Sequence, residues 1–239
     1  MSAPILETRQ LSKTFGGVKA IDRIDFSLAP GELRCLIGPN GAGKSTFFKM
    51  LTGQHRPDGG QVLLNGQDIT AAAAHEIGRL GIGIKNQIPD VFDGLSVAEN
   101  LTLAARFILP KAAAARKVAE VLARVQLEPM AGRLVGELAH GQRQWVEIAM
   151  VVAREPILVL LDEPSAGMSV EETARTAELI REINREATVV AVEHNMQFIR
   201  SIASRVTVFH RGRILVEENV DKALSDRRVR DVYLGRSAA

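Results

Sequence analysis

The sequence has 239 residues, of which 46% are hydrophobic and 24% charged, a composition that can bury the core of a sizeable globular protein. A net charge of +2 is too small to indicate a nucleic-acid partner, and no uninterrupted apolar stretch has the length of a membrane-spanning helix. The first ten residues lack the basic and apolar regions of a signal peptide. The single cysteine, Cys35, excludes an intrachain disulfide and is interpreted as a core thiol. We therefore expect a cytoplasmic protein that reaches a membrane only through partners.

The first quarter of the chain has the pattern of strands and turns. Strands are expected over Ile5–Leu11, Ala20–Leu28, Leu33–Ile37 and Gln61–Leu64. Turns are expected at Pro30-Gly31 and at Asp58-Gly59-Gly60. Between the third and fourth strands, Ser45–Leu51 has the pattern of a helix, which Gly53 closes.

From about residue 89 to residue 152 the pattern is helical and rich in alanine, with apolar side chains at helical spacing in Lys111–Val125. The last third returns to strands alternating with helices. Its expected strands are Ile157–Leu161, Ala187–Val192 and Arg205–Phe209. A helix is expected to start at Ser169, with Glu172 completing a capping box. Continuous aliphatic strands alternating with helices predict an α/β fold with a mainly parallel sheet covered on both faces, interrupted by a helical subdomain.

One glycine-rich segment fits the phosphate-loop pattern in full. It consists of Gly38, Pro39, Asn40, Gly41, Ala42, Gly43, Lys44 and Ser45. Glycines allow backbone N–H groups to face a phosphate, and the helix that follows points its positive end at the same anion. Lys44 would reach the β- and γ-phosphates of ATP, Ser45 would ligate Mg²⁺, and Thr46 would donate to a phosphate oxygen. The alternative is a glycine-rich turn, but a strand before and a helix after are the context that a phosphate loop requires.

A second group of polar residues follows two of the aliphatic strands. Asp162 and Glu163 end the strand over Ile157–Leu161, where Asp162 would hold Mg²⁺ and Glu163 would act as the general base on the attacking water. Taken alone, an apolar strand that ends in acids is a common exit to the surface. His194 follows the next strand, at the edge where a γ-phosphate would lie, and it would sense hydrolysis there. A lone histidine in such a place is more often a surface or capping residue.

These motifs and their order resemble the ATP-binding domain of ABC transporters, over essentially the whole chain. The order is the phosphate loop, Gln87, a signature segment (Leu138, Ala139, His140, Gly141 and Gln142), Asp162-Glu163 and His194. The resemblance implies a P-loop ATPase core, an N-terminal antiparallel β subdomain and an inserted helical subdomain over about 89–152, in one domain over 1–239. It further implies that the signature segment completes the ATP site of a second subunit; read locally, it is a glycine-containing turn before a helix.

The same resemblance assigns roles to further residues. Phe15 matches the aromatic side chain that stacks on adenine, the alternative being a core phenylalanine. Gln87 matches the glutamine that contacts Mg²⁺ or the lytic water and connects the core to the helical subdomain, the alternative being an ordinary polar loop residue. Ser165–Met168 matches the loop through which the two ATP sites of a dimer communicate.

Two residues depart from the family pattern. Ala139 stands where the signature usually has serine, and His140 stands where a glycine usually follows. An alanine cannot bond a γ-phosphate across the dimer, a loss of roughly 1.5–3 kcal/mol. We therefore expect that the phosphate loop and Glu163 of this chain form an intact half of one ATP site. The half-site that its signature segment completes for the partner should bind ATP more weakly, which favours a paralogue as the partner over a second identical copy.

Finer similarity points to a subgroup. Leu138–Met150, Asp162–Ile180 and Val192–Ala203 are similar to the ATPases of urea or short-chain amide importers, relatives of the branched-chain amino acid importers. Lys85–Pro89 is less typical, since an aromatic residue commonly precedes the glutamine. Trp145, in the helix after the signature, is interpreted first as a packing residue and second as a permease contact.

The resemblance implies a peripheral ATPase on the cytoplasmic face of a bacterial inner membrane, binding ATP and Mg²⁺. Its implied partners are permease subunits, a second ABC ATPase and, indirectly, a solute-binding protein. Three alternatives remain: a soluble ABC-type ATPase not coupled to transport, an ATP-binding module with little turnover, and a nucleotide kinase. A kinase gives no reason for Gln87, the signature segment and His194 together.

Overall fold

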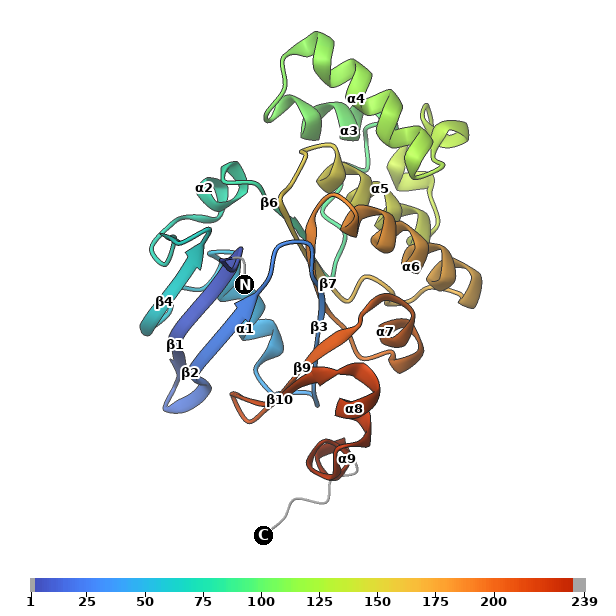
Figure 1. Cartoon of the computed structure of the whole chain (residues 1–239). Helices are drawn as coiled ribbons and strands as arrows, with labels where there is room; N and C mark the ends of the chain where they lie inside the picture. The colour runs from blue at the N-terminus through green and yellow to red at the C-terminus, as the bar shows by residue number, and fades with distance from the viewer. Residues whose placement is uncertain (1–2, 234–239) are drawn as a thin grey trace.

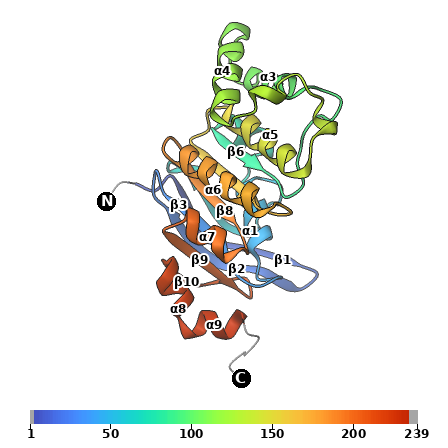
Figure 2. The ribbon, with the colours of Figure 1, turned by 90° about the vertical axis from the view of Figure 1, so that its right-hand side faces the viewer.

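The computed structural model describes residues 3–233, which form two β-sheets with helices between and around them (Figures 1 and 2). The first sheet is antiparallel, with the strand order β2-β1-β4-β5. Its strands are β1 (Leu6–Phe15), β2 (Val18–Leu28), β4 (Gly59–Leu64) and β5 (Gln67–Asp68). The predicted turn at residues 58–60 is shorter than expected, because Gly59 already pairs with Ser12 as the first residue of β4.

The second sheet has the order β10-β9-β3-β8-β7-β6. Its strands are β3 (Leu33–Ile37), β6 (Ile82–Lys85), β7 (Leu158–Asp162), β8 (Thr188–Val192), β9 (Arg205–His210) and β10 (Arg213–Asn219). All neighbours run parallel except β9 and β10, which are antiparallel. The predicted fold class, an antiparallel sheet joined to a mainly parallel sheet with helices, is confirmed. β6 was not predicted, because its four residues are too few to show a period.

Helices cover both sheets and form a separate group between β6 and β7. The helices are α1 (Lys44–Leu51), α2 (Ala74–Arg79), α3 (Val97–Arg106), α4 (Lys111–Arg124), α5 (His140–Val152), α6 (Val170–Asn184), α7 (Met196–Ile202), α8 (Val220–Ser225) and α9 (Arg227–Tyr233), with short 3-10 turns at Glu128–Met130 and Val135–Glu137. The N-cap of α6 is Ser169, whose hydroxyl accepts the N–H of Glu172, as the capping box predicts. Among residues 3–233, no helix has the length and apolar character needed to cross a membrane.

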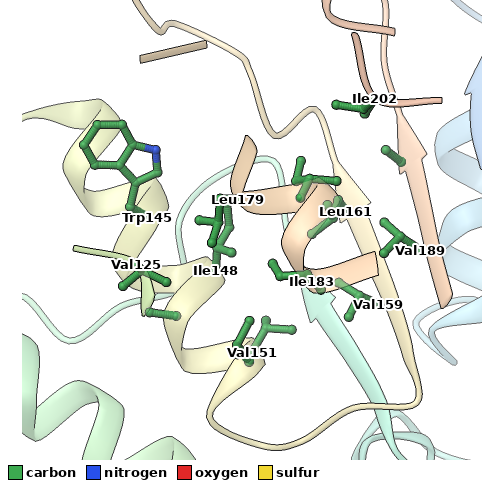
Figure 3. Packing of buried hydrophobic residues seen from close by; sticks show 14 of the residues in the cluster. Val125, Trp145, Ile148, Val151, Val159, Leu161, Leu179, Ile183, Val189 and Ile202 are labelled. Atoms are coloured by element: carbon green, nitrogen blue, oxygen red, sulfur yellow. The ribbon is translucent and has the colours of Figure 1, made fainter. Parts of the chain in front are cut away.

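The parallel sheet buries both faces. Leu158 and Leu160 of β7 belong to an apolar cluster with α1 and the antiparallel sheet, whereas Val159 and Leu161 belong to a cluster with the helices on the other side. This alternation is what a strand covered on both faces requires. Figure 3 shows part of the second cluster, where α5 and α6 meet the sheet. Cys35 lies in it fully buried, and burial raises the pKa of its thiol, so the predicted core thiol is confirmed.

The helical group α3–α5 is inserted in the chain between β6 and β7, which are neighbours in the sheet. β6 pairs with β7 from Ile82↔Leu158 to Lys85↔Leu161, although the whole helical group separates them in the chain. In Figure 1, α3 and α4 lie at the top, away from the antiparallel sheet, and α5 lies below them beside α6. Because β6 and β7 are parallel, the segment leaving β6 and the acids ending β7 come to one edge of the sheet.

Candidate functional site

The phosphate loop joins β3 to α1 and is shaped by glycines. Gly38 and Gly43 have φ angles of 143° and 108°, which L side chains rarely adopt. A Cβ on Gly43 would lie 2.6 Å from the carbonyl oxygen of Ala20, and a Cβ on Gly38 would overlap the carbonyl oxygen of Phe209. Backbone atoms of β2, in the antiparallel sheet, and of β9 therefore contact the loop closely, and only glycine fits at these two positions.

Lys44, the first residue of α1, extends its side chain back across the loop. Its Nζ donates to the carbonyl oxygens of Gly38 at 2.6 Å and Pro39 at 3.1 Å, and the residue is buried. Burial lowers the pKa of Lys44, while the negative charges of Glu163 and Asp162 act in the opposite direction. The loop thus holds a cation beside the acidic pair.

Asp162 ends β7 opposite Val192 of β8. Burial is the main cause that raises the pKa of Asp162, and the adjacent charge of Glu163 raises it further; nearby lysines oppose both effects. Two neighbouring carboxylates at a strand end thus repel each other in a partly buried place. Such a pair is a suitable binding place for a divalent cation.

Glu163 brings three of the predicted residues together. Its Oε2 accepts a hydrogen bond of 2.9 Å from Nε2 of Gln87, and its Oε1 lies 3.7 Å from Nδ1 of His194. Its φ is 47°, in the left-handed region that is uncommon for glutamate, and its N–H donates to the carbonyl of Val192 at 3.0 Å. Strained backbone of this kind concentrates at functional sites, and here it sets the direction of a carboxylate.

Glu193 is a residue that the sequence analysis missed. It is fully buried; its Oε1 accepts the N–H and the hydroxyl of Ser165 at 3.0 and 2.7 Å, and its Oε2 accepts the N–H of His194 at 3.1 Å. One side chain thus ties the loop after β7 to the start of the segment after β8. The available signal was an acid following a buried aliphatic strand, directly before His194.

Phe15 lies at the end of β1, far along the chain from the phosphate loop. Its ring is 44% exposed, so it is not a core residue. It contacts the His55 ring edge-on at 5.5 Å between centroids, and Lys13 lies over it at 5.4 Å. The side chain is thus an accessible flat surface, as a stacking residue requires.

The signature segment precedes and opens α5. Gln142 accepts the N–H of Ala139 at 3.1 Å, and the exposed His140 lies with Nε2 3.0 Å from Nε2 of Gln144. Gln144 also donates to the carbonyl of Ala166 at 3.3 Å. A Cβ on Gly141 would overlap the carboxylate of Glu172. The contacts of this segment thus lead to the loop over Ser165–Met168 of the same chain rather than to its phosphate loop.

Trp145 lies on the inner face of α5. It is buried, its Nε1 donates to the Thr176 hydroxyl at 2.9 Å, and the Arg175 guanidinium lies 3.9 Å from its ring centroid. Figure 3 shows Trp145 on α5 as a member of the buried cluster. The interpretation of Trp145 as a packing residue is confirmed.

A glycine-shaped phosphate loop and an acidic pair at a parallel strand end define the class of P-loop ATPases. The chain also matches the family described as "ABC transporter" over residues 21–166. It therefore belongs to the ABC transporter family, as its ATPase subunit.

Two relatives and one crystal structure from this family are similar to the chain over nearly its whole length. It is 32% identical to the high-affinity branched-chain amino acid transport ATP-binding protein LivG of Escherichia coli K12, over 99% of this chain and 100% of that protein. It is 37% identical to the ribose import ATP-binding protein RbsA 1 of Rubrobacter xylanophilus, over 98% of this chain but only 48% of that protein. The crystal structure of an ATP-binding cassette of an ABC transporter in its ADP conformation superposes with a TM-score of 0.88 at 27% identity, covering 98% of this chain and 100% of the other.

Proposed function

We propose that this chain binds and hydrolyses ATP to power an importer of a small polar solute. The observation that carries the proposal is the position of Glu163, whose two carboxylate oxygens face Gln87 and His194 beside the cation of the phosphate loop. Residues Gly38–Thr46 bind the phosphates, with Lys44 on the β- and γ-phosphates. Glu163 takes a proton from the attacking water, which Gln87 orients, and His194 donates to the γ-phosphate.

The residues fit Mg²⁺. Ser45, Asp162 and Gln87 offer hydroxyl, carboxylate and amide oxygens, the hard donors that this ion prefers. Burial raises the pKa of Asp162, and the charge of Glu163 raises it further, a repulsion that a cation would relieve. Among the described residues, no group of three or more His, Cys, Asp or Glu side chains is arranged to hold a metal ion by itself, and phosphate oxygens and water would complete the ligand set. The ion would neutralise charge on the transferring phosphoryl group.

The remaining site residues act on adenine and on a second subunit. Phe15, exposed at the end of β1, stacks on the adenine ring. Leu138, Ala139, His140, Gly141 and Gln142 complete the ATP site of the partner ATPase. Because Ala139 has no hydroxyl, the site completed by this chain is the weaker of the two, and the partner is a paralogue rather than a copy of this chain.

The partners on the membrane side are permease subunits, which receive solute from a binding protein. Support comes from a cavity of about 350 Å³ between the segment after β6 and helices α3 and α5. Its wall includes Phe92, Leu103 and Phe107, large apolar side chains that are 43–55% exposed. A face of this kind suits a protein partner. This face supports a position at the cytoplasmic face of the inner membrane, where the permeases would hold the chain.

The solute class is a urea-like or short-chain amide, or a branched-chain amino acid. The similarity to LivG, a branched-chain amino acid transport protein, supports the second class, and the similarity of residues 138–150 and 162–180 to urea and amide importers supports the first. Uptake of labelled urea, acetamide and leucine by vesicles containing the assembled transporter distinguishes them. If none is taken up while another solute is, the proposed solute class is wrong.

The catalytic proposal is tested with Glu163→Gln in the assembled transporter. The amide keeps the side-chain size but cannot take a proton, so the ATPase rate should fall roughly 100-fold or more while Mg·ATP binding persists. A variant as fast as the parent would remove Glu163 from the role of base. Ala139→Ser tests the weak half-site, and it should raise nucleotide affinity or rate; no gain would refute the asymmetry.

A further inference from the structure

Two charged side chains near the site are buried and have no role in the proposal above. Lys85, the last residue of β6, is fully buried, and Glu147, in the middle of α5, is 3% exposed. Buried charges are costly, so each must be compensated by specific contacts. In both cases those contacts converge on the short segment that carries Gln87.

Lys85 connects that segment to β7. Its Nζ donates to the carbonyl oxygen of Asn86 at 2.8 Å and lies 3.4 Å from the carbonyl oxygen of Asp162. Burial lowers the pKa of Lys85, and the charge of Glu147 is the strongest influence in the opposite direction. The ammonium therefore lies between the residue before Gln87 and the residue before Glu163.

Glu147 holds the same segment from the side of α5. Its Oε1 accepts the N–H of Asn86 and the N–H of Asp90, each at 3.2 Å. Both backbone polar groups of Asn86 are thus bound by these side chains: Lys85 donates to its carbonyl, and Glu147 accepts from its N–H. Among the described residues, Oε2 of Glu147 is buried with no hydrogen-bond partner; burial raises the pKa of Glu147, and the nearby charge of Lys85 opposes this effect.

We infer that Lys85 and Glu147 are positioning residues that fix the segment Asn86–Asp90, and with it Gln87, against Glu163. In the Gln87–Glu163 hydrogen bond, an exposed amide contacts a carboxylate whose backbone has a positive φ angle. Neither residue by itself fixes the distance between the amide nitrogen and the carboxylate oxygen. Lys85 ties the segment to the acidic strand end, while Glu147 ties it to the helical group. Glu147 thus links α5 to the segment that carries Gln87 by two hydrogen bonds.

This inference rests on the proposed roles of Gln87 and Glu163, and the variants are chosen to separate the two. Lys85→Met and Glu147→Leu remove the charges at similar volume, while Glu147→Gln keeps the oxygen that accepts from Asn86 and Asp90. In the assembled transporter, the first two should lower kcat roughly 10- to 100-fold while leaving the Kd for Mg·ATP within about threefold, because the phosphate loop is untouched. Glu147→Gln should restore much of the rate.

A second readout does not depend on turnover. In Glu147→Leu, hydrogen exchange at the amides of Asn86 and Asp90 should quicken, while amides of the phosphate loop keep their protection. The matched control is Thr176→Val, which removes a buried hydrogen bond between α5 and α6 without touching residues 86–90.

Parent-like kcat in both Lys85→Met and Glu147→Leu, or a loss no larger than in the control, would overturn the inference. Unchanged exchange at residues 86 and 90 would do the same, and it can be read even if Lys85→Met does not fold. A Glu163→Gln variant with full activity would instead contradict the proposed function.

Discussion

Replacing Gly43 by alanine should loosen the phosphate loop by an amount that follows from the geometry. Gly43 has a φ of 108°, and forcing an L residue into such a conformation costs about 1–3 kcal/mol. The new Cβ would also lie 2.6 Å from the carbonyl oxygen of Ala20 and 2.9 Å from Cδ1 of Ile21. Overpacking of that kind adds about 1–3 kcal/mol. The free energy of unfolding should therefore fall by about 2–6 kcal/mol, and any loop that relaxes the overlap displaces Lys44.

Urea unfolding followed by the fluorescence of Trp145, the only tryptophan of the chain, measures the loss. Gly66→Ala is the matched control, because Gly66 has a φ of 79° with nothing within 4 Å of an added Cβ. It should lose only the conformational part, about 1–2 kcal/mol. Binding of a fluorescent ATP analogue should weaken in Gly43→Ala and not in Gly66→Ala. Equal losses of stability in the two variants would refute the reasoning that the Ala20 carbonyl limits the loop.

Three further predictions concern buried polar groups. Glu193→Gln places an amide N–H₂ where a carboxylate now accepts from backbone N–H groups, so the free energy of unfolding should drop by about 1–3 kcal/mol in thermal unfolding. The control Glu178→Gln changes an exposed side chain and should leave the free energy of unfolding nearly unchanged in the same measurement. Burial raises the pKa of Glu147 to about 7 from 4.5, so the folded state binds this proton more tightly than the unfolded state does. As the pH falls from about 7 to about 4.5, the free energy of unfolding of the parent should therefore rise by up to roughly 3 kcal/mol relative to that of Glu147→Gln. A difference between the two proteins that does not depend on pH in urea titrations would contradict this. Thr176→Val leaves the buried indole N–H of Trp145 without its acceptor at 2.9 Å and should cost about 1–3 kcal/mol in urea titrations, with a shift in Trp145 emission.

The sequence predicted seven of the strands, the helices around residues 45–51 and 89–152, and the helix that starts at Ser169, but not α2, α7, α8 and α9. The runs at Leu33–Ile37 and Ile157–Leu161 match β3 and β7 to within a residue, because a strand buried on both faces shows a nearly continuous apolar run. β10 was missed because this edge strand has no residue that is fully buried and its half-buried apolar residues are followed by two glutamates, and β6 because it is short.

The site was predictable to the extent that it lies in contiguous motifs. The phosphate loop and the acidic pair are such motifs, and the structure brings Gln87 and His194 to Glu163. The positive φ of Glu163 and the roles of Lys85, Glu147 and Glu193 were not predictable. They depend on contacts between segments far apart in the chain, which no local spacing reports.

The strand order has a consequence for how the chain is synthesised. β3, which carries the phosphate loop, is made early, yet both of its neighbours in the sheet, β8 and β9, belong to the last third of the chain. Until those strands leave the ribosome, β3 has two unpaired edges and its apolar side chains lack cover. A nascent chain cut off before β8 therefore has every glycine of its phosphate loop and still lacks the sheet that would hold the loop in shape.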